Sequence, residues 1–286
     1  SRISFFGSLP MRSYFLRPRS GQTSVLKSLI PYSQNMEKES VEWGFDVPTV
    51  MYEDENLLVL NKPSGVAVHG DGLRKDRTLA DWLLDTRPQL KDVGEPIETK
   101  AGTTIVRPGI VHRLDKDTSG VMVVAKNQET FEHLKNAFKN REIKKVYNAF
   151  VYGVMNAETG TIDFPIGRSR RDFRLRSAQP KAKGSLREAV TEYRVLERGM
   201  SHSYVEVEPK TGRMHQIRVH FKAIHHPIVN DVLYAPNHPR DLGFTRLALH
   251  AREMTFVKPD GERQAFEAPL PVEFMAGLEV LRSKAG

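Results

Sequence analysis

The residues of this chain that could do chemistry are concentrated in four short stretches, each rich in ionisable side chains and containing or adjoining a glycine. They are Asn61–His69, Gly109–Gly120, Lys144–Gly153 and Thr211–His220. The second carries a His, an Arg and two Asp directly before an apolar run that predicts a buried strand. A turn at the end of such a strand holds polar groups on a rigid support, so we expect a reactive carboxylate there.

The fourth stretch supplies a partner for that carboxylate. Apolar residues at Met214, Ile217 and Phe221 mark one face of a predicted helix, and Arg218 lies on the same side. A guanidinium that points toward the core needs an anionic partner, because an unpaired one costs several kcal/mol. An Asp from a neighbouring turn would be kept ionised by this pairing and ready as a nucleophile at neutral pH. The alternative is an ion pair with a structural role.

Other classes of site are excluded by what the sequence lacks. With no Cys, there is no disulfide scaffold, thiolate zinc site, iron–sulfur site or cysteine nucleophile. His215 and His220 are five apart and belong to no His-Glu-x-x-His motif, so we expect no metal. Neither a phosphate loop nor a Gly-x-Gly-x-x-Gly motif is present, and Ser119 is not in a Gly-x-Ser-x-Gly motif. We therefore predict neither a nucleotide cofactor nor a serine hydrolase.

The positive charge is unevenly distributed. The chain has 43 Lys and Arg against 35 Asp and Glu. The block Arg168–Arg187 holds eight of the basic residues and one acid, with five arginines within nine residues and Phe173 among them. Arginines interleaved with an aromatic ring suit phosphate contact and stacking on an unpaired base, so we expect RNA as the partner. The alternative is a solvated surface loop.

A basic leader precedes the predicted domain. Residues 1–36 contain five basic residues, no acid and eight serines, without an apolar period. This composition is typical of an organellar transit peptide, and the alternatives are a disordered basic arm or upstream sequence before a start at Met36. We predict a leader over 1–45 and one catalytic domain over 46–284. No apolar run approaches the ~18 residues of a membrane span, so we expect no membrane partner.

Strands outnumber helices in the predicted domain. The predicted strands are Leu57–Leu60, Val121–Ala125, Tyr147–Tyr152, Thr191–Leu196, Ser203–Glu208 and Leu247–Val257, the last with a phase shift that indicates a bulge. One predicted helix begins with the capping pair Thr78 and Asp81, and a second follows Asn127. A third carries Arg218, and a last one begins near Pro271 and carries Met275 and Leu278. The irregular order favours an α+β fold with a largely antiparallel or mixed sheet.

The motifs resemble those of the RluA-type pseudouridine synthases. His-Arg-Leu-Asp-x-x-Thr-Ser-Gly stands complete at His112–Gly120. The accompanying motifs follow in order at Asn61–Gly65, Lys145–Ala149, Thr211–His220, His226–Asp231 and Leu249–Ala251. The resemblance covers about Val47 to Leu281. It implies a mixed, largely antiparallel central sheet flanked by helices, with a long active-site cleft.

The resemblance also implies roles for single residues. Asp115 corresponds to the catalytic aspartate, Tyr147 to the tyrosine that packs on the target uracil, and Arg218 to the arginine that pairs with the aspartate. Arg113 corresponds to the arginine that fills the gap left by the flipped base. The remaining residues expected to bind substrate or RNA are His112, Leu114, Asn61, Lys62, Arg213 and His215 from the motifs, and Arg170, Arg171, Arg174 and Arg176 from the basic block.

The reaction implied is the isomerisation of uridine in RNA to pseudouridine, without metal or organic cofactor. It breaks the N1–C1′ bond, rotates the uracil and joins C5 to C1′, after the base has been flipped out of its helix. An ionised carboxylate can attack C1′ or assist deprotonation of the sugar, and both routes stay open. The tyrosine hydroxyl can serve in proton exchange at C5.

We expect a monomer that acts on large-subunit ribosomal RNA in the cytoplasm. The alternatives are transfer RNA as the substrate, a mitochondrial or plastid location if residues 1–36 are a transit peptide, a catalytically silent RNA-binding or ribosome-assembly module, and a metal-assisted hydrolase. Two departures from the family pattern stand out. The N-terminal RNA-binding domain of the S4 type that many relatives carry is not recognisable, and Asn230 stands where many relatives have Gly.

Overall fold

The computed structural model describes residues 43–70, 76–98, 102, 104–170, 172, 175–178 and 182–283. Its helices are α2 (Leu79–Thr86), α3 (Gln128–Lys139), α4 (Gln216–Ala223), α5 (Val272–Ser283) and the 3-10 helix η1 (Pro88–Asp92). Its strands are β1 (Thr49–Glu53), β2 (Leu57–Lys62), β3 (Ile97–Glu98), β4 (Thr104–Ile105), β5 (Ser119–Ala125), β6 (Lys144–Tyr152), β7 (Thr159–Asp163), β8 (Ile166–Arg168), β9 (Arg176–Ser177), β10 (Lys183–Arg187), β11 (Val190–Arg198), β12 (His202–Pro209), β13 (Leu249–Val257) and β14 (Arg263–Glu267). Within the described residues, no helix is long and apolar enough to cross a bilayer.

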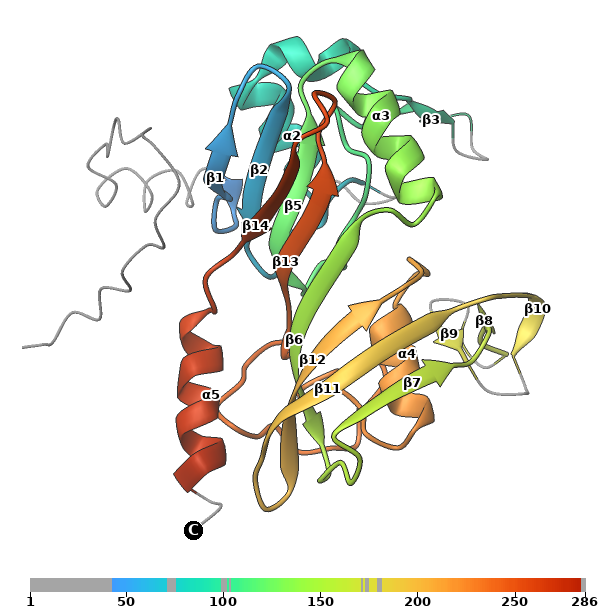
Figure 1. Cartoon of the computed structure of the whole chain (residues 1–286), viewed down its shortest axis with the longest axis vertical. Coiled ribbons are helices and arrows are strands. Elements are labelled where there is room, and N and C mark those ends of the chain that lie inside the picture. The colour runs from blue at the N-terminus through green and yellow to red at the C-terminus, as the bar shows by residue number, and fades with distance from the viewer. Residues whose placement is uncertain are drawn as a thin grey trace, which may run out of the picture.

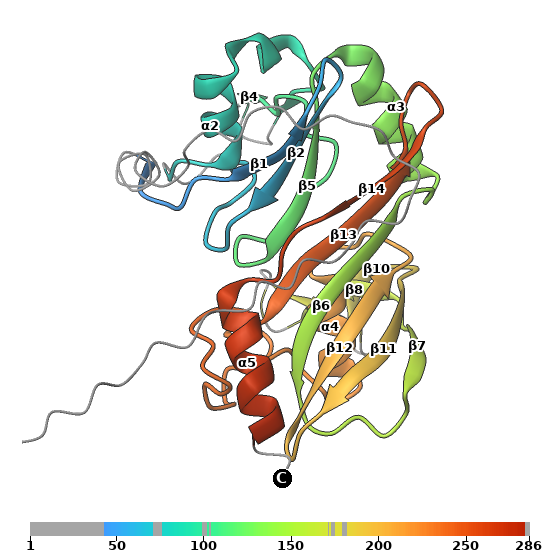
Figure 2. The ribbon, with the colours of Figure 1, turned by 60° about the vertical axis from the view of Figure 1, so that its left-hand side comes forward.

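A mixed sheet runs through the whole molecule. Among the described residues it has nine strands in the order β1-β2-β5-β13-β6-β12-β11-β7, with β14 paired to β13. The pairing of β13 with β5 is parallel and the other pairings in this sheet are antiparallel. β6 and β13 pass from an upper lobe, which carries α2 and α3, into a lower lobe with α4 and α5 (Figures 1 and 2). The α+β fold with a largely antiparallel sheet is therefore confirmed.

The upper lobe covers both faces of its central strands. Every residue of β5 is buried, since Met122 and Val124 pack toward α2 while Val121 and Val123 pack toward α3. The same alternation divides the apolar residues of β2 between the two faces. Strands buried on both faces read as continuous apolar runs, which is why these two were recognisable in the sequence. Because β5 is buried on both faces, it gives the turn that precedes it a rigid support.

Trp43, three residues before the predicted domain boundary, belongs to the folded core. The expected leader lies outside the described residues except for 43–45. Trp43 is buried in the core beside α2, and its ring lies 5.8 Å from that of Phe45. Arg77 lies over the Trp43 ring at 4.4 Å. The folded domain therefore includes residues before 46, because the large apolar ring of Trp43 is covered there.

All four expected helices are present, and at three of them the residues expected to begin the helix do so. Thr78 and Asp81 form a full capping box on α2, and the Asn127 side chain caps α3. Pro271 stands directly before α5. The bulge expected in Leu247–Val257 appears as a register shift in the β13–β6 pairing between Ala251 and Glu253.

Two predicted helix faces were wrong in part. His215 adopts a left-handed conformation with φ 57°, so α4 begins at Gln216 and Met214 is 45% exposed outside it. On α5, Met275 is 50% exposed, whereas Phe274 and Leu281 are buried. Arg218 nevertheless faces inward, as expected, because Ile217 and Phe221 are buried beside it.

One glycine permits the single parallel pairing of the main sheet. Gly120 lies opposite Ala251 of β13 and has a φ of +118°. A Cβ at this position would stand 2.0 Å from the Ala251 carbonyl oxygen. Close approach of the two strands therefore requires a residue without a side chain.

Gly120→Ala is expected to lower the free energy of unfolding by roughly 3 kcal/mol or more, because it adds backbone strain and a clash. Gly261→Ala is the matched control: its φ is +85° and its Cβ would meet nothing within 4 Å. This control should lose about 1–2 kcal/mol. Urea unfolding of both variants measures the difference, and equal losses would contradict the close approach of β5 and β13.

Candidate active site

The turn that carries Asp115 is held from behind by a second turn. The Gly65 amide donates to the Lys116 carbonyl oxygen at 2.9 Å, and the Ser64 hydroxyl donates to the Asp117 carbonyl oxygen at 2.8 Å. Both donors belong to the turn that follows β2, which is the strand next to β5. Two stretches more than 50 residues apart in sequence therefore act as one structural unit.

Lys62 is the centre of this unit. Its side chain is fully buried, and Nζ donates to the carbonyl oxygens of Pro63 at 2.8 Å, Val66 at 2.9 Å and Lys116 at 3.1 Å. Burial lowers the pKa of Lys62 to about 7, against the opposing charge of Asp117. Contact of Lys62 with RNA stays a prediction. In this structure the lysine satisfies three backbone carbonyls beneath the turn that carries Asp115.

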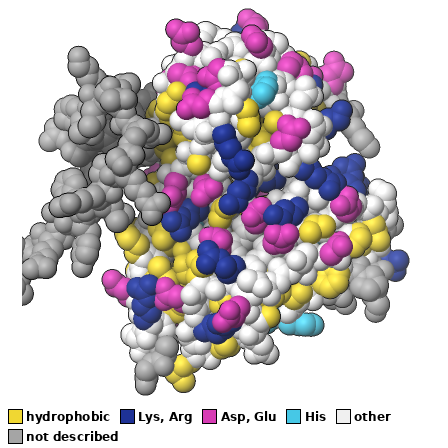
Figure 3. Space-filling model, viewed as in Figure 1, with side chains coloured by type: hydrophobic (Ala, Val, Ile, Leu, Met, Phe, Trp, Pro, Cys, Tyr) yellow, Lys and Arg dark blue, Asp and Glu magenta, His cyan; other side chains and the backbone are white. Residues whose placement is uncertain are grey.

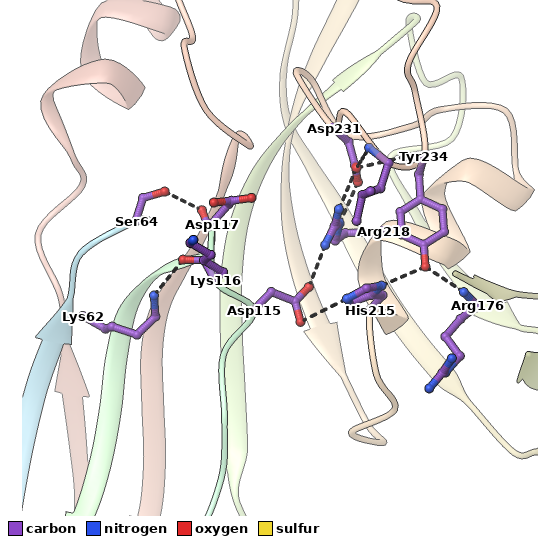
Figure 4. A network of polar contacts seen from close by, with 11 residues as sticks. Lys62, Ser64, Asp115, Lys116, Asp117, Arg176, His215, Arg218, Asp231 and Tyr234 are labelled. Atoms are coloured by element: carbon purple, nitrogen blue, oxygen red, sulfur yellow. Dashed lines mark hydrogen bonds and ion pairs between the residues drawn. The ribbon is translucent and has the colours of Figure 1, made fainter. Parts of the chain in front are cut away.

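Arg218 joins the Asp115 turn to α4. Its Nε and Nη2 each lie 2.7 Å from an oxygen of Asp231, and its Nη1 lies 3.1 Å from Oδ2 of Asp115 (Figure 4). Burial lowers the pKa of Arg218, but its hydrogen bonds and the charges of the two carboxylates outweigh burial and raise it above its ordinary value. The predicted partner of the buried guanidinium is thus present, and it is two carboxylates instead of one.

Asp231 is the functional residue that the sequence analysis did not single out. Its side chain has no exposed surface, and Oδ1 also accepts from the backbone amides of Leu233 at 3.1 Å and Tyr234 at 3.0 Å. The carboxylate is therefore fixed by its own turn before it binds the guanidinium. The available signal was its place as the last residue of the His226–Asp231 motif.

The two oxygens of Asp115 are in different environments. Oδ2 accepts from Arg218, whereas Oδ1 has His215 Nε2 at 3.8 Å, beyond hydrogen-bond distance. The Asp115 side chain is 20% exposed. One oxygen is thus held in place by Arg218, whereas the other has no hydrogen bond to a described residue, which suits a nucleophilic or proton-accepting carboxylate.

A tyrosine connects this cluster to the basic block. The Tyr234 hydroxyl accepts from the Arg176 backbone amide at 2.9 Å and lies 2.9 Å from His215 Nδ1. Burial raises the pKa of Tyr234 to about 12, so the hydroxyl keeps its proton and donates it to Nδ1. The neutral His215 ring then carries its own proton on Nε2, directed toward Asp115. Burial also lowers the pKa of His215, which favours this neutral form.

Tyr147 belongs to β6 and lies near the Asp115 carboxylate. It packs against the core of the lower lobe, and burial together with the Asp115 charge raises the pKa of its phenol above the ordinary value. The phenol therefore stays protonated at neutral pH. Its apolar ring and a hydroxyl that can donate are what this side chain offers a base in the site.

His112 has a structural place that differs from the expectation. Its ring stacks on Phe138 with centroids 4.8 Å apart, and Nε2 accepts from the Val123 amide at 3.0 Å. Burial, with a smaller effect from Lys145, lowers the pKa of His112 to about 3. In this structure His112 therefore supports β5 by accepting from one of its amides, and its contact with RNA stays a prediction.

The other expected binding residues are spread around Asp115. Leu114 is 3% exposed, so this structure does not offer it to RNA, and Asn61 is half-buried. Arg113 and Arg170 are exposed, and Arg176 is half-buried. Arg213 is half-buried and its Nε donates to the Glu188 carbonyl oxygen at 2.9 Å. Arg171 and Arg174 lie outside the described residues.

The clustered histidines are engaged separately. His220 lies between the Thr191 hydroxyl and the Phe164 carbonyl oxygen, and His226 Nδ1 is 2.9 Å from the Tyr152 carbonyl oxygen. Within the described part of the chain, no three His, Asp or Glu side chains are grouped so as to hold a metal ion.

Comparison with known proteins agrees with this geometry. Residues 56–223 match the profile of the family described as RNA pseudouridylate synthase. An uncharacterised RNA pseudouridine synthase of Synechocystis is 39% identical over 236 residues, which cover 82% of this chain and 69% of that protein. The ribosomal large subunit pseudouridine synthase D of Pseudomonas aeruginosa is 36% identical over 288 residues, or 96% of this chain and 84% of the relative.

A solved structure shares the fold. The human RNA pseudouridylate synthase domain containing 4 superimposes with a TM-score of 0.63 at 29% identity, covering 82% of this chain and 92% of the human one.

Asp231→Asn is expected to lower the free energy of unfolding by roughly 3 kcal/mol, because it leaves a buried guanidinium undercompensated. Glu273→Gln is the matched control, since Glu273 pairs with Arg246 at 3.1 Å but is 34% exposed. That pair should contribute about 1 kcal/mol or less. Denaturant titration compares the two variants, and a similar loss in both would show that Asp231 is not a buried anchor.

His112→Gln tests the buried neutral imidazole through pH. A histidine whose pKa falls from 6.5 to about 3 on folding takes up protons in the unfolded state first, so it destabilises the fold as pH drops below 6.5. The stability margin of the wild type over this variant should therefore shrink by up to about 2 kcal/mol between pH 7.5 and pH 5. Urea unfolding at both pH values measures the margin. A margin independent of pH would contradict the burial of a neutral ring.

Proposed function

Because the chain belongs to the RNA pseudouridylate synthase family, isomerases that convert uridine in RNA to pseudouridine, we propose that its substrate is large-subunit ribosomal RNA. The support is the relative in Pseudomonas aeruginosa, which is named for the large ribosomal subunit and is aligned over nearly the whole of this chain. Transfer RNA is the alternative substrate. The cytoplasmic location and the monomeric state stay predictions from the sequence.

The single observation that carries the reaction is the asymmetric Asp115 carboxylate. Arg218 and the two carboxylates that it binds, Asp115 and Asp231, together carry one net negative charge in a largely buried cluster. Breaking the N1–C1′ bond of uridine develops positive charge at C1′, as in glycoside cleavage. A fixed negative charge with one open oxygen stabilises that change, whether the oxygen attacks C1′ or accepts a proton from the sugar.

The released uracil must be kept in the site while it turns. Tyr147 offers a rigid aromatic face from β6, next to the carboxylate, and a base can stack on it. Since its phenol is protonated, it is suited to deliver a proton and unsuited to remove one at neutral pH. A catalytically silent RNA-binding module has no use for this set of groups, and their joint presence favours the enzyme.

The basic block is coupled to the site by packing as well as by hydrogen bonds. Ile166 of β8 and Ala189 bury against Val219 of α4 and Tyr234, so the small sheet β10-β8-β9 rests on the helix that carries Arg218. On the face seen in Figure 3, Lys and Arg side chains also gather across the middle of the molecule. RNA held by the block Arg168–Arg187 would thus be held close to Asp115.

Asp115→Asn is expected to abolish pseudouridine formation, because the amide keeps the shape of the carboxylate but removes its charge. Asp92→Asn, at an exposed position of η1, is the matched control and should act like the wild type. Pseudouridines are mapped in the total RNA of cells that lack the gene and carry each variant. Equal yields from Asp115→Asn and the wild type would contradict the site. Loss of pseudouridine from transfer RNA with ribosomal RNA unchanged would contradict the proposed substrate alone.

A further inference from the structure

Two arginines beside the catalytic turn converge on one histidine nitrogen. Arg107 Nη2 lies 2.9 Å from His69 Nε2, and Arg113 Nη1 lies 3.1 Å from the same atom. The other ring nitrogen, Nδ1, is 2.8 Å from the Gly70 carbonyl oxygen, so Nδ1 carries the proton and Nε2 is the acceptor. A single lone pair therefore serves two guanidinium groups.

Within the part of the chain that the structure describes, this pair of cations has no acidic partner. Among the described residues, no carboxylate forms an ion pair with Arg107 or Arg113, whereas arginines elsewhere on the surface pair with glutamates at 2.6–3.0 Å, as Arg194 and Arg282 do. The Arg107 Nε is buried and has no hydrogen-bond partner. Burial, and then the charge of Arg113, lower the pKa of Arg107. Two cations with unused donors around one neutral acceptor are a site for an anion.

We propose that Arg107, held together with Arg113 on His69, binds a backbone phosphate of the RNA strand next to the flipped uridine. A phosphate offers several acceptor oxygens where the ring offers one, and it can accept from Arg107 Nη2. That donor then leaves His69 Nε2, and Arg113 keeps this acceptor. Phosphate binding thus gives each arginine an acceptor of its own and steadies Arg113.

The position of the cluster fits this ligand. Arg113 precedes Asp115 by two residues of extended chain, so their backbones lie within about 7 Å of each other. A nucleotide with its C1′ at Asp115 has its own phosphates within a few bonds of that atom. Val68, next to His69, packs in the core beside α2, whereas Ile166 of β8, next to the basic block, packs against Val219 of α4. The strand would thus be held on both sides of the carboxylate. This inference rests on the proposed function only in that the substrate is RNA; it holds for ribosomal and for transfer RNA alike.

Arg107→Gln in the full chain is the test, with a labelled RNA fragment that the wild type modifies as the probe. The variant should bind it more weakly, and the slope of log affinity against log salt should fall by about 0.7–0.9, the value for one phosphate contact. Arg107→Lys should keep most of the slope. Arg263→Gln, an exposed arginine on β14 far from Asp115, is the matched charge control and should leave the slope unchanged. A folded Arg107→Gln with the wild-type slope overturns the proposal.

Neutral methylphosphonate linkages give a second readout that does not depend on how the variant folds. Each phosphate within two nucleotides of the target uridine is replaced in turn. The wild type should lose affinity at one linkage, and Arg107→Gln should lose no more there. The proposal is overturned if no linkage replacement weakens binding by the wild type. It is also overturned if the replacement that weakens the wild type weakens Arg107→Gln by the same factor. If ribosomal RNA is not the substrate, the RNA that the wild type does modify serves as the probe. The same results then support or overturn the phosphate site.

Discussion

The active site depends on one guanidinium shared between two carboxylates. Arg218 is 103 residues from Asp115 and 13 from Asp231, and its three nitrogens bring α4, the turn after it and the turn before β5 to one point. Asp231 uses both oxygens on Arg218 and has no exposure, so it sets the orientation of the guanidinium plane. The remaining Nη1 then has its two N–H bonds fixed in that plane, and the bond to Oδ2 holds one oxygen of Asp115. Because a bidentate pair has little rotational freedom, the Asp115 carboxylate inherits the rigidity of Asp231.

The sheet places the groups that this interaction joins. Ala251 of β13 is opposite Gly120 on one side and Tyr147 of β6 on the other. Tyr147 and Gly120, at the start of β5, are therefore two strand spacings apart, about 10 Å, across a single strand. The parallel contact on the β5 side is short, and the Ser119 hydroxyl reinforces it at 2.9 Å from His250 Nδ1. The sheet thus fixes Tyr147 relative to the strand that follows the Asp115 turn.

The features that local sequence patterns could predict are those decided by neighbours in the chain. The β2 and β5 runs, the Thr78 capping box and the bulge in β13 all arise from residues within a few positions of one another. Helical spacing also correctly predicted that Arg218 faces the core. The same reasoning failed at Met214, because α4 begins only after the left-handed His215. Motif membership also gave no sign that His112 and Lys62 bind backbone groups of the fold.

Those two residues show why spacing alone was insufficient. Lys62 donates to Lys116 and His112 accepts from Val123, so each has a backbone partner that is distant in sequence or on the next element. Polar side chains that satisfy buried backbone groups and polar side chains that bind a ligand look alike in a sequence. The difference lies in which atoms the fold brings to them, and this is also why Asp231 was not recognised as the second partner of Arg218.

The arginines of this protein differ in the groups that they bind, and this difference indicates different functions. Arg218 binds two carboxylates in the interior, where its charge is balanced and it can only orient them. Arg194 and Arg282 pair with glutamates on the surface, where such pairs contribute little to stability. Arg107 and Arg113 have a shared imidazole and no acid among the described residues, so their charge is directed outward. Their position is best explained by an anion that arrives with the substrate, and in an enzyme that acts on RNA the abundant anion is the phosphate backbone.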